Sequence, residues 1–332
     1  MWWEDLSSEL LREPRRAVER DGLWYLWLNL YSRIVLTREE EVHRGGYGTL
    51  TRCIREEQTW DAGACIWTVT SKKKVYLKQS FKKVSFREEA LLQRLSQTVL
   101  AGVGMPAAVP PVLDIFVEPS GFVVFTMECY DDYTILSNAL KAGSVSEAAL
   151  CEIIFQIAFL LHVLTDKVGL NHRDIKTSNI LYKLCSAQEK NFSYGGFSSK
   201  ISSQAEVALV DFGFSCVGLK LGEPAFVRAG IYYGPKDPCP KTGRDLYLFL
   251  SLLLRDLYLF GCGGGEKLCD WLEKRLYMPG IDVVGFIKKY LEKDPDWLYF
   301  LAGDSSLVFP HCEPTIILQS LAAEGLINST HI

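Results

Sequence analysis

Residues 172–179 carry the strongest chemical signal in the sequence, with the order His-Arg-Asp-Ile-Lys-Thr-Ser-Asn. A second group, Asp211-Phe212-Gly213, follows the β-prone run Val207–Val210. Taken singly, Asp174 and Asp211 would most simply be aspartates of turns or helix caps. Two carboxylates, a lysine and an asparagine in this order favour one shared, charged site instead.

The two groups together resemble the motifs H-R-D-x-K-x-x-N and D-F-G of eukaryotic-type protein kinases, divergent Ser/Thr members such as viral or haspin-like types included. Phosphoryl transfer from ATP needs metal ligands, a carboxylate that orients the attacking hydroxyl, and a nearby cation. The resemblance implies that Asp174 accepts the hydroxyl proton and that Lys176 steadies the γ-phosphate. It also implies that Asn179 and Asp211 hold Mg²⁺, a metal that prefers hard oxygen ligands.

Residues 43–50, His-Arg-Gly-Gly-Tyr-Gly-Thr-Leu, resemble the glycine-rich loop that covers ATP in that family. The missing side chains of Gly45, Gly46 and Gly48 would let backbone N–H groups approach phosphate oxygens. His43 takes the place of the first glycine, and Leu50 would lie over the adenine. An ordinary hairpin turn with the same residues is the alternative.

Lys78 ends the run Val75-Tyr76-Leu77-Lys78, which resembles the strand whose lysine reaches the α- and β-phosphates. The expected partner is Glu88 on a following helix, with Glu89 as the second choice. A solvated strand lysine is the alternative for Lys78. Tyr76 replaces a small residue and would stack on the adenine, turn away or fill the pocket.

Residues 127–130 end an apolar strand and resemble the hinge that binds adenine through backbone groups, which makes Met127, Glu128, Cys129 and Tyr130 candidate cofactor contacts. Met127 would be the gatekeeper or a methionine that fills a gap in the core. In the same way Asp245 would brace the catalytic loop, or else cap the helix that it opens.

The resemblance implies an α+β, bilobal protein kinase-like fold, and the elements around these residues are typical of it. Residues 1–39 are expected to form an N-terminal helical extension. Short β-prone runs and one helix predict a small antiparallel N-lobe sheet over residues 40–130. Long apolar helical segments predict a mainly helical C-lobe over residues 131–332, with a solvated insertion loop at about 185–205.

The resemblance implies a serine/threonine protein kinase that uses ATP and Mg²⁺ and acts on a protein substrate. Gly234-Pro235-Lys236 stands where A-P-E is expected, and Tyr76 crowds the adenine position. These departures keep two alternatives open, a non-catalytic pseudokinase scaffold and a small-molecule kinase. Of the hydroxyls in residues 214–234, Ser215, Tyr232 and Tyr233 are present and threonine is absent.

Composition excludes several classes of partner. A net charge of −4 at pH 7, with both signs mixed, argues against nucleic acid, and the apolar runs are too interrupted for a membrane span. The ten cysteines show no C-x-x-C pair, so neither a zinc site nor a disulfide framework is predicted. We therefore expect a reducing intracellular compartment, cytoplasmic or nuclear, and treat the N-terminal helices as a candidate surface for a regulatory partner.

Overall fold

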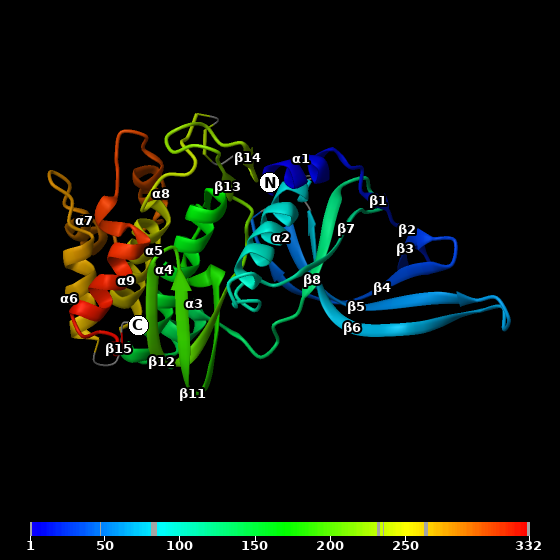
Figure 1. Ribbon diagram of the computed structural model, residues 1–332, viewed down its shortest axis with the longest axis horizontal. Helices are drawn as coiled ribbons and strands as arrows, with labels where there is room; N and C mark the ends of the chain where they lie inside the picture. The colour runs from blue at the N-terminus through cyan, green and yellow to red at the C-terminus, as the bar shows by residue number, and fades with distance from the viewer. Residues whose placement is uncertain are drawn as a thin grey trace. The chain divides into compact units, whose positions relative to one another are not determined.

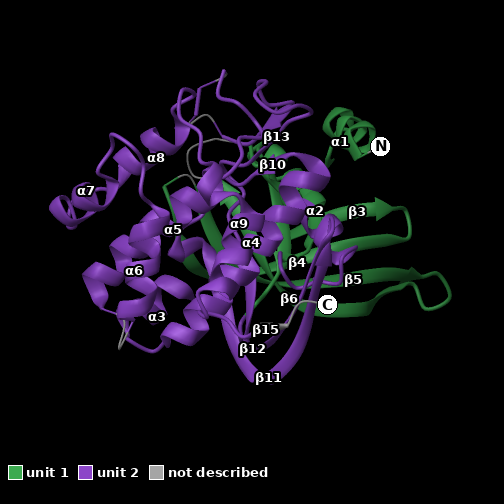
Figure 2. Cartoon of the chain, turned by 60° about the vertical axis from the view of Figure 1, so that its left-hand side comes forward, with its two compact units in different colours: residues 1–95, 110–130 green, residues 96–109, 131–332 purple. Residues whose placement is uncertain are grey.

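The computed structural model describes residues 2–46, 48–80, 85–230, 233–234, 236–261 and 265–330. The chain divides into two compact units (Figure 2). Unit 1 comprises residues 1–95 and 110–130, and unit 2 comprises residues 96–109 and 131–332. Each unit has its own core and is described separately.

Unit 1 opens with a short helix and continues mainly as strands. Its helices are α1 (Trp2–Leu11) and α2 (Arg87–Ala101), the second of which continues into unit 2 from Ser96. Its strands are β1 (Arg15–Arg16), β2 (Val18–Arg20), β3 (Leu23–Asn29), β4 (Ser32–Arg44), β5 (Gly48–Asp61), β6 (Ile66–Ser80), β7 (Val112–Val117) and β8 (Val123–Glu128).

These strands form one sheet in the order β1-β7-β8-β6-β5-β4-β3-β2. β1 pairs with β7 in parallel, whereas the other neighbours are antiparallel. The sheet curls until β1 also contacts β3, so that seven strands close into a mixed barrel. The long β5–β6 hairpin extends well beyond the other strands of this sheet (Figure 1).

A buried apolar cluster forms the core of this sheet. Its members come from six strands, β3 to β8, and from the residue between β1 and β2: Ala17, Trp24, Leu26, Ile34, Leu36, Cys53, Val75, Leu77, Phe116 and Val124. Burial of each large side chain contributes roughly 1.5–3 kcal/mol relative to exposure. A buried ion pair accompanies the cluster, because Asp114 accepts from Arg55 Nε at 2.7 Å and Nη2 at 3.0 Å.

The closed barrel overturns the predicted α+β bilobal kinase-like fold, because the N-lobe of a kinase holds a small open antiparallel sheet. The resemblance to protein kinases is overturned with it. Much of the difference comes from residues 15–39, which were expected to be helical. They supply β1, β2, β3 and the first part of β4. Among the described residues 2–39, helix is confined to Trp2–Leu11. Trp24 and Leu26 are buried while their neighbours are more exposed, which is the period of two typical of a strand.

Unit 2 combines helices with two small sheets. Its helices are α3 (Leu136–Lys141), α4 (Glu147–Val168), α5 (Arg244–Phe260), α6 (Glu266–Arg275), α7 (Val283–Lys289), α8 (Asp296–Gly303) and α9 (Pro314–Ala323), with 3-10 turns η1 (Thr177–Asn179) and η2 (Pro310–Cys312). Its strands are β9 (Thr134–Ile135), β10 (Leu170–Asn171), β11 (Ile180–Tyr194), β12 (Phe197–Leu209), β13 (Cys216–Val217), β14 (Val227–Arg228) and β15 (Ser329–Thr330). The sheet orders are β10-β13-β14 and β15-β12-β11-β9.

Helix α4 is the central element of unit 2. Ser146 caps its start by accepting a hydrogen bond from the Ala149 N–H, and Gly169 ends it in the left-handed conformation at φ 62°. By length and composition alone α4 could cross a membrane, but 78% of its most apolar stretch is buried inside the structure. The helix is thus explained as the core of unit 2.

The predicted solvated loop at 185–205 is wrong. These residues belong to the β11–β12 hairpin, which pairs from Ile180 opposite Leu209 to Tyr194 opposite Phe197. Phe192 is 3% exposed and packs edge-on against Phe155 and Phe159 of α4. Along β12 the side chains of Ser199, Ile201, Ser203 and Ala205 are buried and the residues between them are more exposed, so a polar composition concealed a period of two.

Candidate active site

The loop after β10 carries the side chains predicted at 172–179. Asp245, in the first turn of α5, holds this loop in place. Its carboxylate accepts the main-chain N–H of His172 at 2.7 Å and of Arg173 at 2.8 Å. The expected bracing contact of Asp245 is therefore present, and Gly243 rather than Asp245 is the N-cap of α5.

Asp174 is the centre of a compact polar cluster. Lys176 Nζ donates to both carboxylate oxygens, at 3.0 and 2.9 Å. Asn179 Nδ2 donates to Asp174 Oδ2 and to the Asp174 main-chain oxygen, each at 2.9 Å. Asp174 is 5% exposed and Asn179 is 7% exposed, so these contacts are shielded from bulk water.

Asp211 is positioned beside this cluster by its neighbour Val210. The Val210 N–H donates to the Asn179 main-chain oxygen at 3.1 Å, and the Val210 oxygen lies 3.2 Å from His172 Nε2. Asp211 itself has a φ of 66°, an unusual conformation for a residue with a side chain. Burial lowers the pKa of His172 below its ordinary value, despite the carboxylates around it.

The donor set of Asn179 and Asp211 fits a hard cation such as Mg²⁺. Both N–H groups of the Asn179 amide are committed to Asp174, so its oxygen is the atom suited to a metal. Across the residues that the structure describes, no group of three or more His, Cys, Asp or Glu side chains could hold a metal ion. A magnesium ion at this place would need oxygens from a bound ligand or water as well.

A further residue at this cluster, Tyr299 of α8, was not anticipated. Its hydroxyl donates to Asp174 Oδ1 at 2.6 Å, and the residue is 7% exposed. Tyr299 follows Asp174 by 125 residues and lies in an apolar helix. Nothing in the local sequence pattern indicates this contact, because it depends on how α8 packs.

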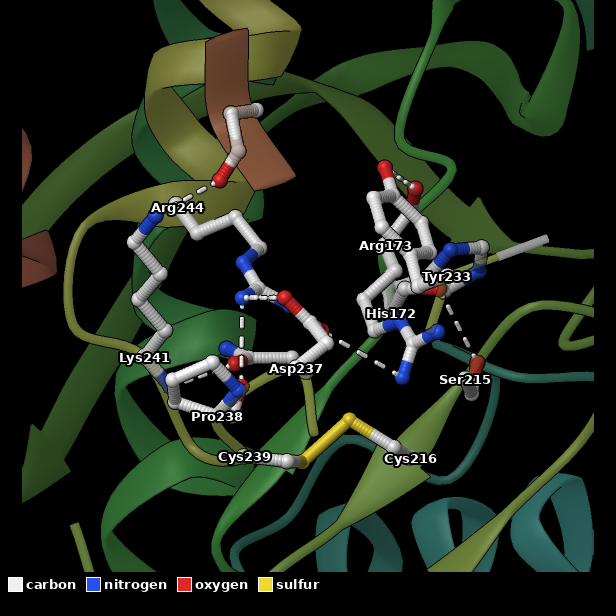
Figure 3. Close-up of polar contacts among 12 residues, drawn as sticks. His172, Arg173, Ser215, Cys216, Tyr233, Asp237, Pro238, Cys239, Lys241 and Arg244 are labelled. Carbon is white, nitrogen blue, oxygen red and sulfur yellow. Dashed lines mark hydrogen bonds and ion pairs between the residues drawn. A yellow bond between two sulfur atoms is a disulfide. The ribbon is translucent and has the colours of Figure 1, made fainter. Parts of the chain in front are cut away.

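The Arg173 side chain lies in a second buried cluster, with Tyr233, Asp237 and Arg244 (Figure 3). Asp237 lies between two guanidinium groups, 3.7 Å from Arg173 Nη1 and 2.7 Å from Arg244 Nη1. The ring of Tyr233 lies 4.3 Å from the Arg173 guanidinium carbon, and its hydroxyl donates to the Arg173 main-chain oxygen. Burial lowers the pKa of Arg173 to about 10, although the Asp237 carboxylate acts in the opposite direction.

A disulfide joins Cys216 of β13 to Cys239, next to this arginine cluster (Figure 3). The cysteine spacing indicated no disulfide framework, and this bond was therefore missed. The two cysteines are 23 residues apart, and spacing alone cannot reveal a bond made by folding. The predicted compartment stays a prediction.

In unit 1, Lys78 forms an ion pair with the second-choice glutamate. Lys78 Nζ lies 2.5 Å from Glu89 Oε1, and the Glu89 side chain is 2% exposed. The expected partner Glu88 is wrong, since the ion pair is made by Glu89. Successive residues of a helix point about 100° apart, so only one of the two glutamates can face Lys78 on β6.

Gly45, Gly46 and Gly48 lie at the turn between β4 and β5. The Gly45 N–H donates to the Gly48 oxygen at 2.9 Å, as in an ordinary hairpin. A Cβ on Gly48 would lie 2.4 Å from the Gln79 main-chain oxygen, whereas one on Gly46 would meet nothing within 4 Å. Packing therefore explains Gly48, and the predicted phosphate contact of all three glycines stays a prediction. Tyr47 lies outside the described residues.

Met127 and Glu128 are the last residues of β8, and Cys129 and Tyr130 follow the strand. Met127 is 8% exposed, and Gln93 Nε2 contacts its sulfur at 3.5 Å. Tyr76 and Leu50 pack against the same small cluster, formed by Phe86, Ala90, Phe125 and Met127. The core role of Met127 is thus observed, while adenine contacts of Met127, Glu128, Cys129 and Tyr130 stay a prediction. The Glu128 N–H already donates to the Pro111 oxygen.

Of the residues expected in place of A-P-E, Gly234 and Lys236 are described and Pro235 is not. Tyr232 also lies outside the described residues. Comparison with models of known protein families and with curated proteins gives no match for this chain.

Proposed function

We propose that this chain is a phosphotransferase that uses ATP and Mg²⁺ to phosphorylate a hydroxyl of a protein substrate, with serine and threonine as the expected acceptors. The observation that carries the proposal is the Asp174 carboxylate held by Lys176 and Asn179 in a buried loop.

The chain's own residues would divide the work as follows. Asp174 would orient the acceptor hydroxyl and take its proton, which requires a heavy-atom distance of about 2.6–3.2 Å. Lys176 is 36% exposed at its side chain and lies on the open side of the cluster, where its ammonium group would meet an anionic phosphate. Asn179 and Asp211 would hold Mg²⁺, which would neutralise phosphate charge when bound.

The test is transfer of radiolabelled phosphate from Mg-ATP to a mixture of generic protein substrates. Asp174→Asn keeps the size of the side chain but removes the base, and it should lower the rate by about 10²–10⁴-fold. The matched control is Asp270→Asn on the exposed face of α6, which should retain the parent rate. Equal rates for the parent and Asp174→Asn would refute the proposal, and so would the absence of transfer to any hydroxyl.

A non-catalytic binding protein is the second candidate, and the observation that favours it is Tyr76. The ring is partly buried against Phe86, Ala90, Phe125 and Met127, so it fills apolar space next to Lys78. A thermal shift with Mg-ATP separates the candidates further, because a ligand that binds only the folded state must raise the melting temperature. Stabilisation without transfer would favour the second candidate.

A further inference from the structure

The Tyr299 hydroxyl contacts the candidate base, Asp174, without any added substrate. The Tyr299 oxygen lies 2.6 Å from Asp174 Oδ1, within the range required between a general base and the hydroxyl that it deprotonates. Lys176 contacts both carboxylate oxygens and Asn179 contacts Oδ2, so Tyr299 completes the set of donors around Asp174. The phenol thus occupies the position that an acceptor hydroxyl needs.

Helix α8 is held firmly in this position. Lys241 Nζ donates to the Ala302 oxygen at 2.9 Å and to the Asp304 oxygen at 2.5 Å, at the carboxyl end of the helix. A positive charge is favourable there because the helix dipole is negative at that end. Gly303 lies so close to the ring of Tyr233 that a Cβ would come within 2.9 Å of it. The contact of Tyr299 with Asp174 is therefore supported by packing along α8.

We propose that Tyr299 is a phosphorylation site that the chain modifies within its own molecule. This inference rests on the proposed function. The Tyr299 oxygen attacks the γ-phosphorus of ATP and forms the new P–O bond. The bond from that phosphorus to the β–γ bridging oxygen breaks, and ADP leaves with its electron pair. The phenol proton passes to Asp174.

The product would not fit where the tyrosine lies. A phosphotyrosine carries about −1.5 to −2 charge at pH 7, and here it would face the Asp174 carboxylate in a buried site. Like charges at such a distance repel strongly when water is excluded. Phosphorylated Tyr299 therefore leaves the base, and Asp174 becomes accessible to hydroxyls of other molecules. Transfer to an added substrate is expected to show a lag that ends as Tyr299 is modified.

The experiment follows phosphate on the tryptic fragment after Lys293, in which Tyr299 is the single tyrosine. The dephosphorylated parent is incubated with Mg-ATP at several protein concentrations, with and without a generic protein substrate. We expect phosphotyrosine on this fragment at a rate constant independent of protein concentration. The label should be lost in Tyr299→Phe and in Asp174→Asn. Tyr277→Phe is the matched control, since Tyr277 is 71% exposed, and it should keep the label.

The outcomes separate this inference from the function on which it rests. Asp174-dependent transfer to the added substrate, without phosphate on Tyr299, would overturn the inference and leave the proposed function intact. Labelling that survives Asp174→Asn, or that speeds up with protein concentration, would also overturn it. Absence of transfer in the parent and in Tyr299→Ala would overturn both. Tyr299→Phe keeps the buried ring, so a folded protein is tested even if Tyr299→Ala unfolds.

Discussion

Asp245 holds the loop of the candidate active site by hydrogen bonds. The loss of stability on its replacement can be worked out from these contacts. The carboxylate is 4% exposed and accepts the N–H groups of His172 and Arg173. A hydrogen bond to a charged group contributes about 1.5–3 kcal/mol. Asp245→Asn turns one acceptor oxygen into a donor, so one buried N–H loses its partner and we expect about 1.5–3 kcal/mol of destabilisation. Asp245→Ala removes both acceptors and should cost about 3–6 kcal/mol.

The assay is chemical unfolding combined with hydrogen exchange of peptides that cover residues 170–175. Exchange at the His172 and Arg173 amides should rise in both variants, because these amides lose their acceptor. The rate of phosphate transfer should fall in both variants, since a small displacement of Asp174 can cost about 10²-fold in rate. Asp270→Asn is again the control. If Asp245→Ala changes the free energy of unfolding by less than about 0.5 kcal/mol, the usual range for surface substitutions, the argument is wrong.

Two further predictions concern buried charges. Asp114→Ala leaves the Arg55 guanidinium buried without its main partner and should lower the free energy of unfolding by about 3–5 kcal/mol. Glu57→Gln, at a half-exposed contact of the same arginine, should lower it by less than about 1 kcal/mol. Similar losses for the two variants in chemical unfolding would contradict this. Burial lowers the pKa of Lys241 to about 8 from 10.5, so the unfolded chain binds more protons than the folded one between these values. The free energy of unfolding should therefore rise with pH across that window, by at most about 1.4 kcal/mol per pH unit relative to Lys241→Met, and a parallel pH dependence of the two proteins would refute it.

The local elements of the candidate site were predictable, because their signals are local. β5, β6, β7 and β8 and the helix α2 lie in the part of the chain, residues 40–130, where strands and one helix were expected, and the long helices α4 and α5 lie in the part, residues 131–332, expected to be mainly helical. The loop at 172–179 was found through residue types and spacing, and the structure brings Asp174, Lys176 and Asn179 together. Their chemical roles stay a prediction.

The barrel was not predictable by the same means. Its closure depends on the contact of β1 with β3 and on the parallel pairing of β1 with β7, and the second of these joins residues about 100 positions apart in the chain. β1 is two residues long, too short for a periodic pattern to show. The choice of Glu89 over Glu88 and the position of Tyr299 likewise depend on packing, which a single sequence does not display. Packing contacts thus determine these features of the structure, and local sequence patterns do not indicate them.

The carboxylate of Asp237 is shared by two arginines. Arg173 and Arg244 are almost fully buried, and Asp237 offers them one negative charge between them. Within the described part of the chain, Arg173 Nε and Nη2 have no hydrogen-bond partner. The Asp237 side chain ties together the loop after β10, the start of α5 and the stretch before Cys239. Withdrawal of that one group would loosen all three segments at once, which makes Asp237 a common anchor of this half of the molecule.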